Sequence, residues 1–379
     1  MIEVAIEKRL GDFRLDTRFS VPNAGIVALF GPSGAGKTSI INAIAGLLRP
    51  DSGRIVLNGE TLFSSAERID IPPRRRGVGY VFQEGRLFPH VSVRRNLVYG
   101  MPKSRQAARI GFDNVVALLG LEALLARRPG ALSGGEKQRV AIGRALLAQP
   151  KLILMDEPLA SLDAARKAEI MPFIERLHGE LHIPIIYVSH DMDENMRLAD
   201  TLVVIENGRA AAVGPVEELT SRLDLQPLIG RFDAGAVIRA TVAGHDLNFG
   251  LSELAFSGGR LKVARVGLPL GTAVRARIRA RDVAVATRRP EQISIRNILP
   301  ARIVEVAQDP ERPPVMNLRL DIGREGEPVM LLARVTVRAS RELNLSQGAS
   351  VFALIKTIAL DRRSYVPFGQ TQADAGDSL

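Results

Sequence analysis

The residues best suited to chemistry in this sequence are those at positions 31–38, which read GPSGAGKT and match the spacing G-x-x-x-x-G-K-[ST]. Glycines at these positions let successive backbone N–H groups turn toward an anion without a side chain in the way. Lys37 would then contact the β- and γ-phosphates of a nucleotide, and the Thr38 hydroxyl would hold Mg²⁺. The residues of this loop that we expect to bind the nucleotide are Gly31, Pro32, Ser33, Gly34, Ala35, Gly36, Lys37 and Thr38.

A strand and a helix must hold this loop in place. The apolar run at residues 26–30 predicts a buried strand, and residues 39–46 have the apolar spacing of a helix. The start of that helix adds partial positive charge aimed at the bound phosphates. The sequence therefore predicts a strand, a phosphate-binding loop and a helix in that order, which is the context that the motif requires.

Two adjacent carboxylates follow another apolar run. Residues 152–155 are apolar and lead directly into Asp156 and Glu157. A buried strand that ends in Asp places a carboxylate at the carboxyl edge of a parallel sheet, where Mg²⁺ beside the phosphate loop would lie. Glu157 would stand next to the γ-phosphate, where it can accept a proton from an attacking water or orient it. Of the five histidines, His190 is the one placed to sense the phosphate, because it also ends an apolar run.

Two further sites could contact the nucleotide. Ser133, Gly134 and Gly135 open a predicted helix and form a second helix N-terminus suited to phosphate, although such a cap is also an ordinary helix start. Phe13 could stack on an adenine ring, or it could fill the core. By contrast, the three arginines at residues 74–76 read as a solvated loop.

Composition limits the possible functions. The chain has 379 residues, enough for two or three domains, and a net charge of +10. It has no cysteine, which excludes disulfides, thiolate catalysis and cysteine-bound metals. Aromatic residues make up 4% and tryptophan is absent, so we expect no base-stacking platform and no nucleic acid partner. No apolar run reaches the ~18 residues of a membrane span, so we expect any membrane role to come through a partner.

The motifs occur together in the order and spacing of one family. Over residues 1–225 the chain resembles an ATP-binding-cassette (ABC) ATPase, whose Walker A, Q-loop, signature, Walker B, D-loop and switch histidine would be residues 31–38, Gln83, 132–138, 152–157, 161–163 and His190. The resemblance implies ATP and Mg²⁺ as cofactors, with Glu157, His190 and Gln83 catalytic and Thr38, Gln83 and Asp156 on the metal. It also implies two cassettes facing head to tail, so that each ATP lies between Lys37 of one chain and residues 133–135 of the other.

The C-terminal part of the chain has a different character. From residue 236 onward, short β-type runs suit one or two small β-barrels. The segment that begins SIRNILPARI at residues 294–303 resembles a molybdate-binding Mop domain. That resemblance marks six candidate oxyanion ligands, which are Ser294, Arg296, Asn297, Thr336, Ser340 and Lys356. Each of them could instead be a strand or turn residue that satisfies its own backbone.

The expected fold is an α/β P-loop ABC ATPase domain followed by an all-β OB-like (Mop/TOBE) barrel domain. Its expected parts are the ATPase domain at residues 1–230, a linker with the first barrel strands at 231–287, the Mop domain at 288–362 and a disordered tail at 363–379.

A cassette followed by a Mop-like domain resembles the ATP-binding subunits of molybdate importers over nearly the whole chain. The resemblance implies a peripheral ATPase at the cytoplasmic face of the inner membrane that drives uptake of molybdate, or tungstate. Its implied partners are a second copy of the chain, integral-membrane permease subunits docked around residues 87–99 and, indirectly, a solute-binding protein.

Three alternatives remain open at this stage. An importer for sulfate, iron or sugar is disfavoured by the motif at residues 294–303. An oxyanion-binding or storage protein with a regulatory cassette is disfavoured by the intact catalytic motifs. A soluble cassette ATPase that acts on ribosomes or DNA usually carries two cassettes, whereas this chain has one Walker A motif.

Overall fold

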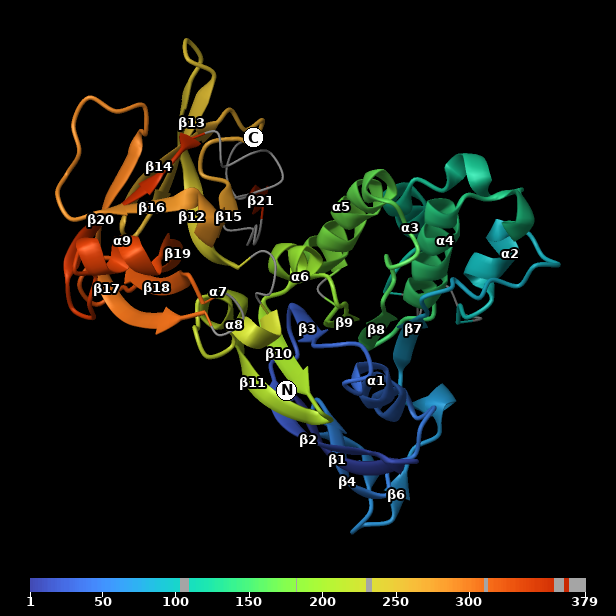
Figure 1. Ribbon diagram of the computed structural model, residues 1–379. Coiled ribbons are helices and arrows are strands. Elements are labelled where there is room, and N and C mark those ends of the chain that lie inside the picture. The colour runs from blue at the N-terminus through green and yellow to red at the C-terminus, as the bar shows by residue number, and fades with distance from the viewer. Residues whose placement is uncertain (103–108, 182, 230–233, 310–312, 358–364, 368–379) are drawn as a thin grey trace. The chain divides into compact units, whose positions relative to one another are not determined.

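The computed structural model describes residues 1–102, 109–181, 183–229, 234–309, 313–357 and 365–367. The chain forms two compact units, Met1–Gly214 and Pro215–Leu379 (Figure 1). Within the described part of the chain, every helix is too short or too polar to cross a membrane.

A mainly parallel sheet forms the centre of the first unit. Its strand order is β11-β10-β3-β9-β8-β7, and the pairs from β10 to β7 are parallel. The bounds are β3 Ile26–Phe30, β7 Val78–Val81, β8 Leu152–Asp156, β9 Ile185–Val188, β10 Thr201–Glu206 and β11 Arg209–Pro215. Strands β3 and β9 are buried throughout. Because a parallel sheet is covered on both faces, such strands read as continuous apolar runs, and the sequence predicted them for that reason.

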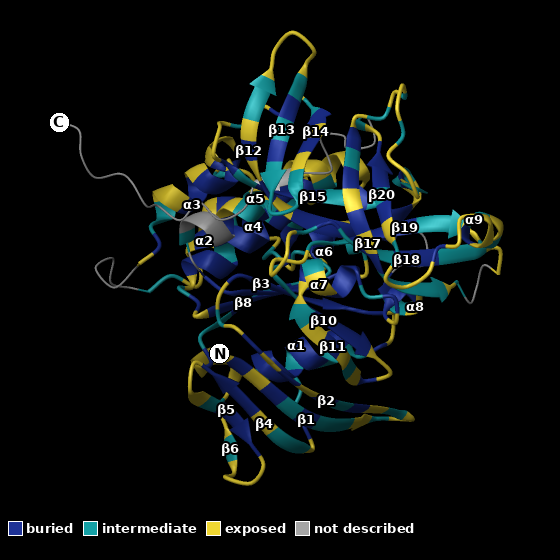
Figure 2. Cartoon of the chain, turned by 90° about the vertical axis from the view of Figure 1, so that its left-hand side faces the viewer, coloured by how far each residue is buried: buried dark blue, intermediate teal, exposed yellow. Residues whose placement is uncertain are grey.

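A second sheet of the first unit is antiparallel and has the order β2-β1-β4-β5-β6. Its strands are β1 Ile2–Leu10, β2 Phe13–Val21, β4 Ser52–Leu57, β5 Glu60–Ser64 and β6 Ile69–Asp70. Buried and exposed residues alternate along β1 and β2, so one face of this sheet is buried (Figure 2). Helix α1, Lys37–Ala45, contributes Ile40, Ile41 and Ile44 to a core shared with strands of both sheets.

The remaining helices of the first unit enclose a second apolar core with strands β7, β8 and β9. They are α2 Val93–Val98, α3 Phe112–Leu119, α4 Gly134–Leu147, α5 Ala164–Leu181 and α6 Met192–Leu198, with short 3-10 turns η1 Pro73–Arg75, η3 Glu122–Leu124 and η4 Pro129–Ala131. Helices α3, α4 and α5 contact one another. The start of α4 carries the predicted signature residues, and the start of α5 follows the predicted D-loop.

The sequence predicts that the three arginines at residues 74–76 form a solvated loop. This prediction is wrong for one of them, Arg76. The side chain of Arg76 is 1% exposed, and its guanidinium donates to the carbonyl oxygens of Ala43 and Ile44 at 2.7 and 2.9 Å. The last carbonyls of a helix have no partner within the helix. Arg76 therefore caps the C-terminus of α1, the helix whose other end begins at Lys37.

Two five-stranded antiparallel sheets make up most of the second unit, in the orders β14-β13-β12-β15-β21 and β16-β20-β17-β18-β19. The strands are β12 Gly235–Asp246, β13 Leu251–Phe256, β14 Gly259–Ala264, β15 Ala273–Arg279, β16 Val283–Ala286, β17 Asn297–Gln308, β18 Val315–Asp321, β19 Met330–Thr336, β20 Ser350–Ile355 and β21 Tyr365–Pro367. Helices α7 Val216–Thr220, α8 Gln226–Ile229 and α9 Val337–Glu342 and the turn η5 Ala280–Asp282 complete it. Apolar residues of both sheets form one core.

The boundaries of the parts differ in detail from those expected. The first unit ends at Gly214 rather than at residue 230, because α7 packs against β12 and its Glu217 pairs with Arg239. Strand β16 is among the first barrel strands expected at residues 231–287, and it pairs with β20, which lies in the expected Mop domain. Of the tail at residues 363–379, residues 365–367 form β21, and the rest lies outside the described residues.

Candidate nucleotide-binding and catalytic site

The predicted phosphate loop lies between β3 and α1, as the sequence indicated. Two of its glycines are required by the space around them. A Cβ atom at Gly31 would lie 2.1 Å from the carbonyl oxygen of Ile205. Gly36 has a φ of +101°, which favours glycine, and a Cβ there would lie 3.1 Å from the ring of Phe13. The carbonyl of Ile205 and the ring of Phe13 therefore exclude a side chain at these two positions of the loop.

Lys37 is the cation of the loop, and its side chain is 5% exposed. Its Nζ donates to the carbonyl oxygens of Gly31 and Pro32, both at 2.8 Å. Burial lowers the pKa of Lys37, and the charges of Glu157 and Asp156 oppose that shift. The loop therefore holds the ammonium group beside both predicted carboxylates.

Asp156 ends β8, and both of its carboxylate oxygens have partners. The Thr38 hydroxyl donates to Oδ1 at 3.0 Å, and the Tyr80 hydroxyl lies 3.3 Å from Oδ2 and 2.9 Å from Oδ1 of Asn42. Burial raises the pKa of Asp156, while the two hydrogen bonds lower it. A hydroxyl and a carboxylate in contact offer the hard oxygen donors that Mg²⁺ prefers, so Thr38 and Asp156 fit that ion.

Glu157 follows Asp156 in a strained backbone conformation. Its φ is +44°, the left-handed region that costs a residue with a side chain about 1–2 kcal/mol. The Glu157 N–H donates to the carbonyl oxygen of Val188 at 3.0 Å, and its Oε1 lies 3.2 Å from Nδ1 of His190. Backbone strain held by surrounding bonds often occurs at functional positions. Here it turns the carboxylate toward His190.

The other predicted nucleotide ligands lie on separate elements. Gln83 is exposed and follows β7, which pairs with β8 up to Val81 and Met155, so it stands at the same sheet edge as Asp156. Ser133 is the N-cap of α4, where its hydroxyl accepts from the Glu136 N–H and its own N–H donates to the Glu136 carboxylate. Gly134 is exposed and Gly135 is buried against Ile170. Phe13 opens β2 and packs on the core beside Gly36, which leaves both of its proposed roles open.

Two residues of this site were missed in the sequence. The Tyr80 hydroxyl contacts Asp156 directly, and Asn42, which lies in α1 among apolar residues, contacts that hydroxyl. A tyrosine hydroxyl inside a buried strand needs a partner, so Tyr80 could have been suspected from its place in the apolar run before Gln83. Nothing in the sequence indicated that the partner would be Asp156.

The six candidate oxyanion ligands form two groups. Lys356 follows Ile355, which pairs with Asn297, so Ser294, Arg296, Asn297 and Lys356 lie at one end of the β17–β20 pair. Thr336 pairs with Val315 beyond the other end of β17 and caps α9, in which Ser340 lies. A single chain therefore does not gather all six.

Asn297 is fully engaged within the chain. Its Oδ1 accepts from the N–H of Lys262 at 2.6 Å, and its Nδ2 donates to the carbonyl oxygen of the same residue at 2.9 Å. The side chain is 2% exposed. Of the two roles that the sequence left open for this residue, the geometry supports the one that satisfies backbone groups.

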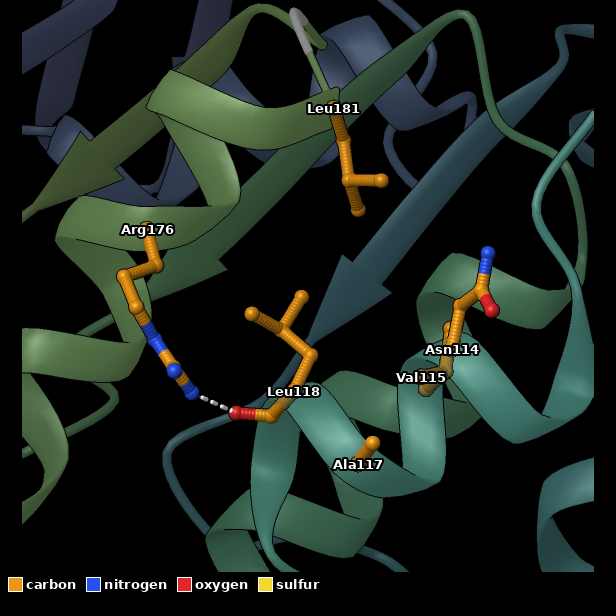
Figure 3. A pocket seen from close by; sticks show the side chains of 6 residues that line it. All are labelled: Asn114, Val115, Ala117, Leu118, Arg176 and Leu181. Carbon is orange, nitrogen blue, oxygen red and sulfur yellow. Dashed lines mark hydrogen bonds between the residues drawn. The ribbon is translucent and has the colours of Figure 1, made fainter.

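A pocket of about 440 Å³ lies between α3 and the end of α5, away from these residues (Figure 3). Its lining includes Asn114, Leu118 and Leu181, and Arg176 donates to the carbonyl oxygen of Leu118 at its rim. Because Arg176, the charged residue among the described lining residues, already caps the end of α3, we assign no ligand to this pocket.

Comparison with known proteins gives the same division of the chain. A family model described as ABC transporter matches residues 15–160, and one described as TOBE domain matches residues 293–360. Among solved structures, cbiO1 from Clostridium perfringens, part of the ABC transporter complex cbiONQ, has a TM-score of 0.51 and 27% identity, and the match covers 60% of this chain and 92% of that one. A nucleotide-free ATP-binding cassette from an ABC transporter has a TM-score of 0.50 and 28% identity, covering 57% and 92%.

Two curated relatives match nearly end to end. The protein named Molybdenum import ATP-binding protein ModC from Paramagnetospirillum magneticum is 53% identical over 363 residues, which cover 96% of this chain and 98% of the relative. A protein with the same name from Rhodospirillum rubrum is 51% identical over 368 residues, which cover 97% and 99%.

The fold and the site together define an ABC transporter ATPase with an N-terminal cassette and a C-terminal TOBE domain. The predicted fold class is thereby confirmed. On its similarity to relatives over almost its whole length, the chain belongs to the family of molybdenum import ATP-binding proteins.

Proposed function

We propose that this chain is the ATP-hydrolysing subunit of an importer that carries molybdate into the cell. The observation that carries the proposal is the convergence of Lys37, Thr38, Asp156, Glu157 and His190 at one edge of the parallel sheet. The names of the near full-length relatives support molybdate as the solute, and the ATP and Mg²⁺ requirements follow from the family.

Each residue of the site has a separate role in the proposed reaction, in which ATP and water give ADP and phosphate. Lys37 binds the β- and γ-phosphates through the ammonium that the loop already holds. Thr38 and Asp156 would hold Mg²⁺, which when bound neutralises phosphate charge. Glu157 orients the attacking water or accepts its proton, and His190 keeps the Glu157 carboxylate in position. Gln83, at the neighbouring strand end, could join the metal ligands or the water.

We further propose that two copies of the chain act together. Ser133 and Gly134 are exposed at the N-terminus of α4 and Gly135 is buried behind them, and the partial positive charge of this helix end can attract a phosphate. Docked head to tail, these residues of one chain would complete the ATP site at Lys37 of the other. The ATP would then lie between the chains and hold them together.

The surface proposed to dock on a permease is the segment at residues 87–99. The buried side chain of Asn96 holds it through the N–H and carbonyl oxygen of Phe88, at 2.8 and 3.1 Å. Arg144 of α4 donates to the Gly85 carbonyl and stacks on the Phe88 ring. The segment is thereby tied to α4 while Tyr99 stays 72% exposed. We propose that this surface docks on integral-membrane subunits at the cytoplasmic face of the inner membrane, with a solute-binding protein as an indirect partner.

Transport by cells tests the proposed function. In cells that lack this chain, wild type is expected to restore uptake of labelled molybdate, and Glu157→Gln is expected not to. Labelled sulfate serves as the control for another solute, and tungstate competition measures the preference between the two larger oxyanions. Rescue of sulfate uptake without rescue of molybdate uptake would contradict the proposal.

A further inference from the structure

A buried carboxylate, that of Glu194, follows His190 in the chain and has no role in the proposed reaction. Glu194, in α6, is 4% exposed. Its Oε2 accepts from the hydroxyls of Tyr187 and Ser189 at 2.7 and 2.8 Å, and its Oε1 accepts from Nζ of Lys167 at 2.6 Å. A carboxylate this deeply buried is costly unless it is paired and hydrogen-bonded, and here both oxygens have partners.

Ser189, the residue just before His190, makes three hydrogen bonds with residues of this region. The Ser189 hydroxyl donates to Glu194 and accepts from the N–H of Asp191 at 3.0 Å. The Ser189 carbonyl oxygen accepts from Nδ2 of Asn195 at 3.2 Å. The backbone is therefore fixed on both sides of His190, whose own side chain contacts Glu157.

Lys167 joins this cluster to another helix. Its Nζ also donates to Asp191 at 3.1 Å, so one ammonium bridges the two carboxylates, Asp191 and Glu194, that follow His190 in the chain. Lys167 belongs to the first turn of α5, and its N–H donates to the carbonyl oxygen of Asp163, the last residue of the predicted D-loop. The turn that carries His190 and the segment that ends at Asp163 are thus connected through a single side chain.

The charges of the cluster agree with its geometry. Burial alone would raise the pKa of Asp191, but the hydrogen bond and charge of Lys167 outweigh burial and leave that pKa below its ordinary value. Burial likewise opposes the charge on Lys167, but its hydrogen bonds to Glu194 and Asp191 outweigh burial and raise its pKa. Lys167 and Asp191 are therefore charged at neutral pH.

We propose that Lys167 and Glu194 are positioning residues that hold His190 against Glu157 and tie it to the first turn of α5. The inference rests on the proposed ATPase function and adds a structural connection from α5 to His190. A shift of the segment ending at Asp163, such as the approach of a second chain could cause, would move Lys167 and with it the turn that carries His190. Hydrolysis would then depend on the position of α5 as well as on the residues at the phosphates.

The same two helices supply a matched control. Arg197 of α6 donates to Glu175 of α5, an ion pair that also joins α5 to α6 but lies away from the His190 turn. A substitution there disturbs the packing of the helices without touching Ser189 or Asp191. Effects specific to the positioning role should therefore appear in Lys167→Met and be absent in Glu175→Gln.

The first measurement is amide hydrogen exchange of the full chain without nucleotide. In Lys167→Met, the amides of residues 189–194 are expected to exchange at least about tenfold faster than in wild type, because the bridge between the two carboxylates is lost. Lys167→Arg should restore protection in part, and Glu175→Gln should leave these amides as in wild type. Unchanged exchange in Lys167→Met, or an equal increase in Glu175→Gln, would overturn the proposal.

The second measurement is steady-state ATP hydrolysis. Lys167→Met is expected to lower kcat by about tenfold to 100-fold with KM for ATP within about twofold of wild type, because only the alignment at the γ-phosphate changes. Glu194→Gln keeps the shape of the side chain and serves if Lys167→Met does not fold. Faster exchange with an unchanged kcat would also overturn the proposal. Failure of the wild-type chain to restore molybdate uptake in cells would instead refute the proposed function, while the exchange measurement would still decide whether Lys167 holds the turn.

Discussion

At the scale of single residues, two side chains of opposite charge divide the work at the phosphates. Lys37 donates to the carbonyls of Gly31 and Pro32, which hold its ammonium within the loop. Glu157 is directed toward His190 and, in the proposed reaction, acts on water. Affinity for the nucleotide and the rate of its hydrolysis should therefore depend on different residues.

Substitutions of these two residues should separate the two quantities. Lys37→Ala is expected to lose nucleotide affinity, because the main charge on the β- and γ-phosphates is gone. Glu157→Gln is expected to bind ATP as wild type does and to lower turnover by about 100-fold or more, because the general base is lost. Titration with a fluorescent ATP analogue and phosphate release measure the two. Equal loss of binding in both variants would contradict this division.

At the scale of elements, the helix that presents Lys37 depends on a distant arginine. Arg76 gives its guanidinium hydrogens to the Ala43, Ile44 and Ile71 carbonyls and to Asp70. Without it, buried carbonyls at the end of α1 would lack a partner, and each such group costs about 1–3 kcal/mol.

Arg76→Met is therefore expected to lower the free energy of unfolding by about 2–6 kcal/mol, because the carbonyls of Ala43 and Ile44 would each lose a buried donor. Arg75→Met is the matched control, because Arg75 is exposed and its replacement should change stability by less than about 0.5 kcal/mol. Urea unfolding of the two variants beside wild type makes the measurement. A similar loss of stability in both variants would show that the three arginines act as a charged surface and not through the bonds of Arg76 to the end of α1.

The stability of the fold should depend on pH in part through helix α6. Asp191 caps α6 and has a pKa below its ordinary value, so its folded form prefers the charged state. Such a group stabilises the fold above the unfolded pKa, near about 4, and that contribution is lost as the pH falls through the depressed folded value. The stability difference between wild type and Asp191→Asn should shrink as the pH is lowered from about 7 to about 3. Urea unfolding at each pH tests this, and a constant difference would contradict it.

The sequence predicted those parts of the site whose interacting residues are close together in the chain. The loop at Lys37 and the carboxylates at Asp156 and Glu157 were found because the residues that build them are adjacent in the chain. Arg76 and Glu194 were missed because their partners, Ala43 and Lys167, lie far away in sequence and satisfy burial that no local pattern reveals. Residues of the Mop-like segment were marked by resemblance alone, and the structure separates them into two groups.

At the scale of the whole molecule, the proposed head-to-tail pair can be tested through a property of the composition. The chain has no cysteine, so the only thiols in a variant are those introduced by substitution. Ser33 in the phosphate loop and Ser133 at the start of α4 are both exposed. In the proposed pair, Ser33 of one chain would face Ser133 of the other across the ATP.

A full chain with Glu157→Gln, Ser33→Cys and Ser133→Cys should form a covalent dimer with a short bis-maleimide when Mg²⁺ and ATP are present. The nucleotide is not consumed in this background and should hold the two chains together. Either cysteine alone is the control and should give little product. Cross-linking that is equal with and without ATP would speak against a dimer closed by the nucleotide.

The bond between Asn297 and Lys262 also bears on solubility in the cell. Strand β14 is the outermost strand of its sheet, and an open strand edge is a template on which other chains can add. The amide of Asn297 occupies both the N–H and the carbonyl of Lys262, in the middle of that edge. Asn297→Ala should therefore leave the cassette able to bind ATP but raise the fraction of protein found in inclusion bodies, whereas Ser294→Ala should not. A position marked as an oxyanion ligand would then owe its asparagine to the prevention of aggregation.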